Sequence, residues 1–538
     1  MYPFLRDPSR WTAPDVLAWQ AEANPSRIFV QAVDGAGLTY EQAHGRAARL
    51  ATYFAGLGVR PGDPAVVLLR NDVDLVAVWL GLARLGATAV LLNTELSGAF
   101  LVHQMENCGA RLAVVAADLL PAVEAVAGRL THLERIVVAG DAVAAREGSP
   151  WPVSALSDGR GCAPFEGPRP RPSDIACIMY TSGTSGPAKG VLMPHAHCFL
   201  FGLGTIDNLG MTPDDRYYVT LPLYHANGLL MQVHACLIAG ATAIVRERFS
   251  AGAWLADIRR HRATLTNTLG VVAPFVFSQP GTEADTDHAL RILLASPNPP
   301  EMERVWRDRF AVPEVLSGYG MTEVNIPVWG RTGDRVPAGS AGRVYDRYFE
   351  VEIFDPDTDA IVPRGTTGEI VVRPRAPFGF MCGYHNLPDR TVEAWRNLWF
   401  HTGDAGYMDE GGFVFFVDRL RDCIRRRGHN ISSFEVERAF LALAGVIEAA
   451  AYAVPSEIPG GEDEIMVGVV LESRSALTPP EICARISAEL PRFAQPRYIE
   501  ILPSLPKTQT GKVQKVELRK RGIANAAWDR EAHSPARR

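Results

Sequence analysis

The 538-residue sequence lacks several features that mark specialised classes of protein. Its eight cysteines are scattered without paired spacing, which excludes a disulfide framework and a cysteine-rich zinc module. We expect them to be small buried hydrophobic residues. No uninterrupted apolar run is long enough to cross a bilayer, and the start has no basic segment followed by an apolar stretch. These features predict a cytoplasmic protein without a membrane span.

The sequence also lacks a strong charge of either sign. Its 54 basic and 60 acidic residues give a formal charge of -6, so no nucleic-acid partner and no anionic membrane is indicated. Hydrophobic residues make up 47% and charged residues 21%, which is typical of a soluble globular protein. A chain of this length is too long for one compact core and predicts several domains.

The N-terminal part has the pattern of an α/β fold. Thr39 and Gln42 form the pattern of a capping box that opens a helix to about Ala55, which Gly56 and Gly58 would end. A short apolar run, a helical pattern and another apolar run follow at residues 65–69, 72–85 and 88–92. This β-α-β order recurs further along the chain and predicts a parallel sheet with layered helices.

The pattern changes near residue 350. Short apolar runs separated by Pro, Gly and Asp turns predict a β-rich subdomain. We therefore predict an α/β protein with a large N-terminal domain of layered α/β subdomains plus a β-rich subdomain, over residues 1–419. A small mobile α+β C-terminal domain is expected over residues 420–525, and a polar, flexible tail over residues 526–538.

One segment of the chain is suited to holding phosphate. After an apolar run, residues 180–191 read YTSGTSGPAKGV. Glycines bring backbone N–H groups close to a ligand, the hydroxyls add donors and the lysine adds a cation. The spacing differs from that of a Walker A loop. A flexible linker is the alternative, and the apolar stretches on both sides argue against it.

Taken whole, this segment resembles the signature loop of the adenylate-forming superfamily, which contains acyl-CoA synthetases, luciferases and peptide-synthetase adenylation domains. The resemblance implies that the loop binds the β- and γ-phosphates of ATP. The residues concerned are Thr181, Ser182, Gly183, Thr184, Ser185 and Lys189.

Residues 317–323, SGYGMTE, resemble a second block of that superfamily. The resemblance implies that Tyr319 stacks on adenine, that Thr322 bonds the α-phosphate and that Glu323 holds Mg²⁺. These roles suit a flat ring and a hard oxygen ligand. The alternative is a glycine-rich turn before a helix that Thr322 caps.

Three further residues match superfamily blocks in the expected order. Asp404, in a Thr-Gly-Asp sequence, and Arg419, in an Asp-Arg pair, are implied to bind the ribose. Lys512 ends a segment that reads LPKTQTGK and is implied to reach between the α-phosphate and the substrate carboxylate. A cation at that point stabilises the charge of the transition state. Each block alone is weak evidence. The interpretation rests on the occurrence of all the blocks in the order found in the superfamily.

The resemblance also implies a pocket for a carboxylic acid. His225, in LPLYHANG, would border the substrate carboxylate and position it, because a carboxylate needs no general base at neutral pH. The alternative is a core histidine with a backbone partner. The implied wall is mostly apolar and predicts a medium to large hydrophobic acyl or aryl acid; it comprises His225, Gly228, Val271, Pro274, Ser296, Gly320 and Met321.

Residues 425–435, RRRGHNISSFE, resemble a loop that lines a coenzyme A tunnel, most closely in bacterial carnitine and crotonobetaine CoA ligases. The resemblance implies that Arg426, Arg427 and Gly428 meet CoA, and the guanidinium groups of the two arginines suit its phosphates. A solvated basic turn is the alternative. His429 stands where that branch often has an acidic residue.

These observations predict an AMP-forming acyl-CoA ligase that uses ATP, Mg²⁺ and coenzyme A, as a monomer or homodimer. An enzyme of only one half-reaction, a luciferase-like oxygenase and a non-catalytic nucleotide-binding homologue remain alternatives. An amino-acid substrate is disfavoured, because residues 226–231 have no charge to pair with an ammonium group.

Overall fold

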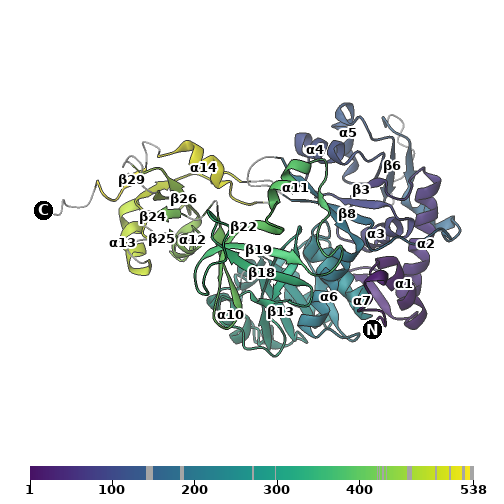
Figure 1. Cartoon of the computed structure of the whole chain (residues 1–538), viewed down its shortest axis with the longest axis horizontal. Helices are drawn as coiled ribbons and strands as arrows, with labels where there is room; N and C mark the ends of the chain where they lie inside the picture. The colour runs from purple at the N-terminus through teal and green to yellow at the C-terminus, as the bar shows by residue number, and fades with distance from the viewer. Residues whose placement is uncertain are drawn as a thin grey trace.

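The computed structural model describes residues 1–140, 149–181, 187–269, 272–296, 298–420, 422, 424–426, 429–431, 433–456, 463–490, 494–507, 511–523 and 527–532. Within these ranges the chain forms a large N-terminal domain and a small C-terminal domain, which lies at the left of Figure 1. The mixed α/β architecture predicted from the sequence is confirmed.

The first sheet of the large domain carries the predicted phosphate segment. Its described strands run in the order β20 (Gly383–Tyr384), β9 (Lys189–Pro194), β8 (Ile175–Thr181), β4 (Thr88–Leu91), β3 (Pro64–Leu68), β5 (Leu112–Ala116), β6 (Arg135–Ala139) and β7 (Val153–Ala155). The strands from β8 to β7 are parallel, as the β-α-β pattern predicts, whereas β9 returns antiparallel to β8. The described ends of the phosphate segment, Thr181 and Lys189, therefore face each other at the ends of two paired strands.

A second, mostly parallel sheet lies beside the first. Its order is β14 (Glu314–Leu316), β13 (Ile292–Ser296), β12 (Leu265–Leu269), β10 (Arg216–Val219), β11 (Thr242–Val245), β1 (Ile28–Ala32) and β2 (Gly37–Thr39). Helices cover both sheets; those of the large domain are α1 (Ala13–Ala23), α2 (Tyr40–Gly56), α3 (Val73–Leu85), α4 (Gly98–Cys108), α5 (Leu120–Glu124), α6 (His195–Leu209), α7 (His234–Ala239), α8 (Ala251–Arg260), α9 (Val272–Phe277), α10 (Pro300–Asp308) and α11 (Pro388–Ala394).

Local sequence signals explain several of these elements. The capping box is present at the start of α2, where the Thr39 side chain and the Gln42 side chain each bond the other's backbone N–H. Nearly every residue of α3 and α6 is buried, so these two helices pack inside the large domain and not on its surface. Contrary to expectation, not every described cysteine is buried, since Cys382 is exposed and Cys162 is half-buried.

The predicted β-rich subdomain is an antiparallel sheet. Its order is β15 (Gly318–Met321), β16 (Asn325–Trp329), β17 (Gly342–Val344), β23 (Phe413–Arg419), β22 (Trp399–Met408), β19 (Gly368–Pro374) and β18 (Phe349–Phe354), with β21 (Trp395–Arg396) beside β22. The alternative interpretation of residues 317–323 as a turn before a helix is wrong, because β15 forms the first arm of a β-hairpin, Thr322 and Glu323 lie in its turn, and a strand follows.

The C-terminal domain has its own apolar core. A sheet of β26 (Val446–Val454), β27 (Glu464–Leu471), β28 (Tyr498–Ile501) and β29 (Trp528–Asp529) packs with α12 (Ser433–Leu441), α13 (Pro479–Glu489) and α14 (Lys515–Arg521). A small hairpin, β24 (Ile424–Arg426) and β25 (His429–Ile431), precedes them.

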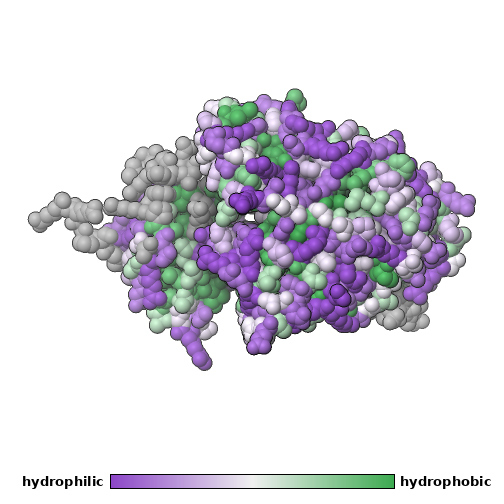
Figure 2. Space-filling model, turned by 90° about the horizontal axis from the view of Figure 1, so that it is seen from below, coloured by the Kyte–Doolittle hydropathy of each residue, from purple (hydrophilic) through white to green (hydrophobic). Residues whose placement is uncertain are grey.

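The two domains contact each other at the end of β23. The Asp418 carboxylate accepts hydrogen bonds from the backbone N–H groups of Ser433 and Phe434, at 2.7 and 3.3 Å, and so caps the first turn of α12. Arg438 on α12 forms an exposed ion pair with Glu301 on α10, at 3.3 Å. Figure 2 shows a notch between the domains on the face seen from below.

Candidate active site

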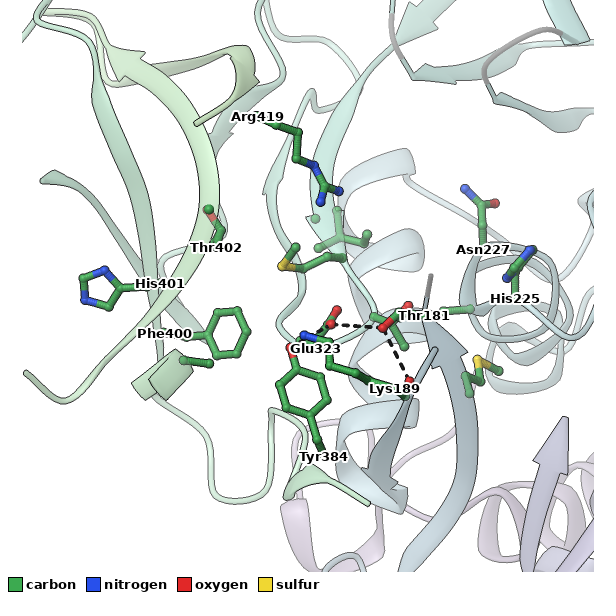
Figure 3. A pocket seen from close by; sticks show the side chains of 18 of the residues that line it. Thr181, Lys189, His225, Asn227, Glu323, Tyr384, Phe400, His401, Thr402 and Arg419 are labelled. Carbon is green, nitrogen blue, oxygen red and sulfur yellow. Dashed lines mark hydrogen bonds between the residues drawn. The ribbon is translucent and has the colours of Figure 1, made fainter. Parts of the chain in front are cut away.

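A cavity of about 810 Å³ lies where the three sheets of the large domain approach the C-terminal domain. Its wall includes nine residues predicted from the sequence, which are Thr181, Lys189, His225, Ser296, Gly320, Met321, Thr322, Glu323 and Arg419. Lys512, from the C-terminal domain, also lines it. Figure 3 shows the labelled side chains arranged around this space. Residues more than 300 positions apart in the sequence are therefore brought to one site.

The phosphate segment begins and ends at this cavity. Thr181 and Lys189 are cross-strand partners at the ends of β8 and β9, so the hairpin connection starts and finishes at the cavity wall. The Lys189 ammonium lies 4.0 Å from the centre of the Tyr384 ring, a cation–π contact. Four residues predicted to bind phosphate, Ser182, Gly183, Thr184 and Ser185, lie outside the described residues.

The hairpin of β15 and β16 presents Thr322 and Glu323. A Cβ atom at Gly320 would lie 2.1 Å from the Asn325 carbonyl oxygen, so only glycine allows the two strands to approach this closely. Glu323 is 5% exposed and its Oε1 accepts a hydrogen bond from the Tyr384 hydroxyl at 3.0 Å. The Thr181 hydroxyl lies 3.4 Å from the same oxygen.

The donor set around Glu323 fits a magnesium ion shared with phosphate. No cluster of three His, Cys, Asp or Glu residues that could hold a metal occurs in the described part of the chain. A single carboxylate is nevertheless a normal protein contribution to Mg²⁺, because phosphate oxygens and water complete the octahedron. Glu323 is such a carboxylate, on the cavity wall and near the phosphate segment.

Asp404, on β22, is held from two sides. It accepts a hydrogen bond from the Tyr319 hydroxyl at 2.8 Å, and its Oδ1 lies 2.9 Å from Nε of Arg419. Burial raises the pKa of Asp404 to about 6, and the Arg419 guanidinium opposes this shift. The Tyr319 ring packs beside Phe416, with centroids 6.1 Å apart, while the described wall of the cavity includes Gly318 and Gly320 but not Tyr319.

Lys512 reaches the cavity from the C-terminal domain as an exposed residue, and nearby protein atoms remove part of the water around its ammonium group. Burial lowers its pKa, the positive charge of Arg419 lowers it further, and the Asp404 carboxylate acts in the opposite direction. The C-terminal domain therefore places a partly desolvated cation in the same cavity as Thr322 and Glu323.

His225 is surrounded by the large domain, yet its side chain is exposed to the cavity. Burial, with a smaller contribution from the Lys512 charge, lowers the pKa of His225 to about 4. The ring is therefore neutral near pH 7 and packs edge-on against Tyr224, with centroids 4.6 Å apart. A neutral imidazole can border a carboxylate without forming an ion pair with it.

The predicted acyl wall is brought together only in part. Ser296 and Met321 line the cavity, and the Ser296 hydroxyl donates to the Gly318 carbonyl oxygen at 3.0 Å. Gly228 is buried and Pro274 is exposed on α9, and neither is on the described wall. Val271 lies outside the described residues.

The described residues of the basic segment lie in the paired strands β24 and β25. Arg426 is 1% exposed; its Nε lies 2.7 Å from Glu464 and its Nη1 donates to the Gln495 carbonyl oxygen at 2.9 Å. The Arg426 guanidinium is therefore bonded to groups of the C-terminal domain and is buried in this structure. Arg427 and Gly428 lie outside the described residues.

Among the residues of the cavity wall that the sequence analysis missed, Tyr384 and Asn227 carry polar groups into the site. Tyr384 reaches Glu323 and Lys189 from β20, which is remote in sequence from both. Asn227 follows His225 by two positions, and its place inside the large domain depends on partners from other elements. Asn227 lies inside the LPLYHANG block, but nothing in that block shows that its side chain faces the cavity, and Tyr384 belongs to no local pattern that would mark it.

Comparison with known proteins agrees with this geometry. The model of the AMP-binding enzyme family matches residues 17–385, and that of the AMP-binding enzyme C-terminal domain matches residues 435–512. A crotonobetaine/carnitine-CoA ligase of Salmonella paratyphi A is 30% identical over 88% of this chain and 91% of its own length. Long-chain fatty acid transport protein 6 of Mus musculus is 28% identical over 95% of this chain and 85% of its own.

Solved structures agree as well. A benzoate CoA ligase from Burkholderia xenovorans superposes with a TM-score of 0.79 and 26% identity, covering 94% of this chain and 99% of its own. An anthranilate CoA ligase in complex with anthranoyl-AMP has the same fold, with a TM-score of 0.83 at 24% identity over 95% of this chain and 97% of its own.

No described helix is both long and apolar enough to cross a membrane. The cytoplasmic location expected from the sequence stays a prediction. The matched family models cover most of the chain, and the match to the crotonobetaine/carnitine-CoA ligase extends over most of both proteins. The chain therefore belongs to the AMP-binding enzyme family of the adenylate-forming superfamily, as an ATP-dependent acyl-CoA ligase.

Proposed function

We propose that the cavity activates a hydrophobic carboxylic acid and that Lys512 is the catalytic cation of the first half-reaction. The observation that carries this proposal is the presence of Lys512 in one cavity with Thr322, Glu323 and Arg419. The carboxylate attacks the α-phosphate of ATP, the bond to the β-phosphate breaks, and acyl-AMP and pyrophosphate form. Lys512 and the Thr322 hydroxyl stabilise the charge that gathers at the α-phosphate.

The phosphates that leave as pyrophosphate are assigned to the segment from Thr181 to Lys189, which ends in a cation and contains closely spaced hydroxyls and glycines. Mg²⁺ would be held by Glu323, and when bound it neutralises phosphate charge. The ribose is assigned to Asp404 and Arg419, which already form a pair at 2.9 Å. Tyr319, whose hydroxyl bonds Asp404, is assigned to the adenine side.

The acid is proposed to be a medium to large acyl or aryl acid. Support comes from the apolar residues on the wall near His225, which include Ala226, Met231, Leu269 and Leu294. His225 is assigned to positioning the substrate carboxylate by contact. Its ring is neutral and so carries no positive charge that could neutralise the carboxylate. Burial of apolar surface would then supply most of the affinity for the acyl part.

For the second half-reaction we propose that the C-terminal domain, residues 420–525, pivots near residues 419–421 and withdraws Lys512. The coenzyme A thiol then attacks the acyl carbonyl, AMP leaves, and the thiol proton passes to solvent. The hairpin of β24 and β25 would face the CoA phosphates, with Arg427 and Gly428 as candidate contacts. Arg426 enters this contact only if its ion pair with Glu464 is broken, so we assign it to holding the hairpin in shape.

The test separates the two half-reactions. Pyrophosphate release is measured with an acid panel, ATP and Mg²⁺, and conversion of synthetic acyl-AMP to acyl-CoA is measured separately. Lys512→Ala is expected to slow pyrophosphate release by roughly 10²- to 10³-fold or more and to leave acyl-AMP conversion largely intact. Lys520→Ala, on the exposed surface of α14, is the control and should change neither rate.

Equal loss in both assays would contradict the role of Lys512. The same pair of assays decides between a complete ligase and an enzyme of one half-reaction, because the latter would support only one of the two conversions. If no acid of the panel supports pyrophosphate release, a non-catalytic nucleotide-binding protein would be favoured.

A further inference from the structure

The described wall of the cavity near His225 contains one side-chain amide, Asn227. It starts a stretch of π-helix, Asn227–Val233, in which the backbone is wider than an α-helix. Such turns occur frequently at functional sites. Figure 3 shows Asn227 beside His225, with its amide nitrogen turned toward the side on which Thr181 and Arg419 lie.

The surroundings of Asn227 on this wall are apolar. Met231 lies one helical turn further along the π-helix, and Leu269 and Leu294 come from the neighbouring strands β12 and β13. Leu294 is the cross-strand partner of Asn267. Asn227 therefore sets a polar group into a surface otherwise suited to hydrocarbon, which costs free energy unless that group finds a partner.

A chain of buried hydrogen bonds fixes the orientation of the Asn227 amide. The Tyr217 hydroxyl donates to Oδ1 of Asn267 at 2.6 Å, so Nδ2 of Asn267 is free to donate to Oδ1 of Asn227, at 2.7 Å. Nε2 of Gln232 donates to the same Asn227 oxygen at 3.0 Å. Tyr217 and Gln232 are 0% exposed and Asn267 is 1% exposed, so the chain is closed to solvent.

This arrangement uses both lone pairs of Asn227 Oδ1 and leaves its Nδ2 as the available group. No acceptor for Nδ2 is found in the part of the chain that the structure describes. Water can satisfy this donor in the free enzyme, but an acid that fills the wall with hydrocarbon displaces that water and offers no acceptor in its place.

We propose that Asn227 donates a hydrogen bond to an oxygen on the acyl part of the substrate. The substrate is thus a hydrophobic carboxylic acid that carries an uncharged acceptor, such as a hydroxyl, keto or ether oxygen. A second carboxylate fits less well, because the wall residues contributed by the π-helix, β12 and β13 include no cation. This inference rests on the proposed function, since it assumes that the acid occupies the wall beside His225.

The experiment uses the full-length enzyme and matched pairs of acids. Phenylpropanoic and phenylbutanoic acids are compared with their ring-hydroxyl and methoxy derivatives, and straight-chain acids with their keto derivatives at successive positions. For each pair, kcat/KM for pyrophosphate release gives a ratio of oxygenated to parent acid. At least one pair is expected to show a preference of about tenfold to hundredfold for the oxygenated acid.

Asn227→Leu keeps the volume of the side chain and removes the donor, so the ratio should fall to near one. Asn267→Leu removes the group that orients Asn227 without touching the wall, and it should lower the ratio as well. Lys520→Ala, on the exposed surface of α14 and outside the described wall of the cavity, is the control and should keep the preference. Asn227→Ala serves as the second test of the donor if the leucine variant does not fold.

A wild-type enzyme that prefers every parent hydrocarbon acid overturns the inference, and so does a preference that survives the loss of Asn227. Failure of the inference is distinct from failure of the proposed function. In the first case pyrophosphate release and its dependence on Lys512 remain, whereas in the second no acid supports release or Lys512→Ala has no effect.

Discussion

At the scale of single residues, Tyr384 links the cation and the carboxylate of the phosphate site. Its hydroxyl donates to Glu323 at 3.0 Å and its ring lies 4.0 Å from the Lys189 ammonium. Tyr384→Phe removes the hydrogen bond and keeps the ring, so KM for ATP should rise by roughly fivefold to tenfold. Tyr384→Leu also removes the cation–π contact and should raise it further.

The measurement is pyrophosphate release as a function of ATP concentration at saturating acid. Tyr53→Phe is the matched control, because it also removes one hydroxyl bond, to the Ala155 carbonyl oxygen, but far from the cavity. An unchanged KM for ATP in both Tyr384 variants would show that Glu323 and Lys189 keep their positions without this side chain.

At the scale of secondary-structure elements, the N-terminus of α12 depends on a residue of the other domain. Asp418, on β23, is 6% exposed and accepts from the Ser433 and Phe434 N–H groups. A helix cap is worth about 1 kcal/mol, and here it also fixes the domain that carries Lys512. Asp418→Ala should therefore slow pyrophosphate release by roughly tenfold and affect acyl-AMP conversion less.

Glu301→Gln is the control at the same domain contact. Its ion pair with Arg438 is half-exposed on both sides, and such pairs contribute little. If the Asp418 variant slows both half-reactions equally, Asp418 supports the fold of the C-terminal domain and not the position in which Lys512 enters the cavity.

Elements with strong local signals could be predicted from the sequence. The capping box of α2, the apolar strands β3 and β4 and the helical pattern of α3 were all predicted to within a few residues. The phosphate and SGYGMTE segments were also found, because both have an unusual local composition. Their setting in hairpins was not predicted, since a short glycine-rich segment does not reveal whether the next residues form a strand or a helix.

Contacts between distant parts of the chain could not be predicted. Arg426 was expected to face coenzyme A because it lies in a basic run, yet its partner Glu464 is 38 positions later and has no local mark. The Asn227 and Asn267 pair depends in the same way on how the π-helix meets β12. The sequence shows which residues carry a charge or an amide, but the fold decides which residues they contact.

At the scale of the whole molecule, three buried histidines predict sensitivity to acid. His195 and His197 in α6 and His234 in α7 are at most 2% exposed. Burial lowers the pKa of His195 and His197 to about 4 and that of His234 to about 3. Each is neutral in the folded protein at pH values where it is already protonated in the unfolded chain.

The sign of the effect is set by proton counting. Between pH 6.5 and about 4 the unfolded chain binds more protons than the folded protein, so the free energy of unfolding falls as the pH falls. The slope is about 1.4 kcal/mol per pH unit for each such histidine. Below about pH 4 the folded protein also takes up protons at His195 and His197, and their contribution levels off.

Denaturant unfolding at pH 7, 6 and 5 measures this slope. His234→Gln removes one of the titrating groups. It should reduce the slope by about 1.4 kcal/mol per pH unit, which corresponds to one proton, whatever it does to stability at pH 7. His132→Gln, at an exposed position, is the control and should leave the slope unchanged. Equal slopes in the wild type and the His234 variant would mean that His234 already carries its proton in the folded core, where its Nδ1 faces the Cys198 carbonyl oxygen at 3.2 Å.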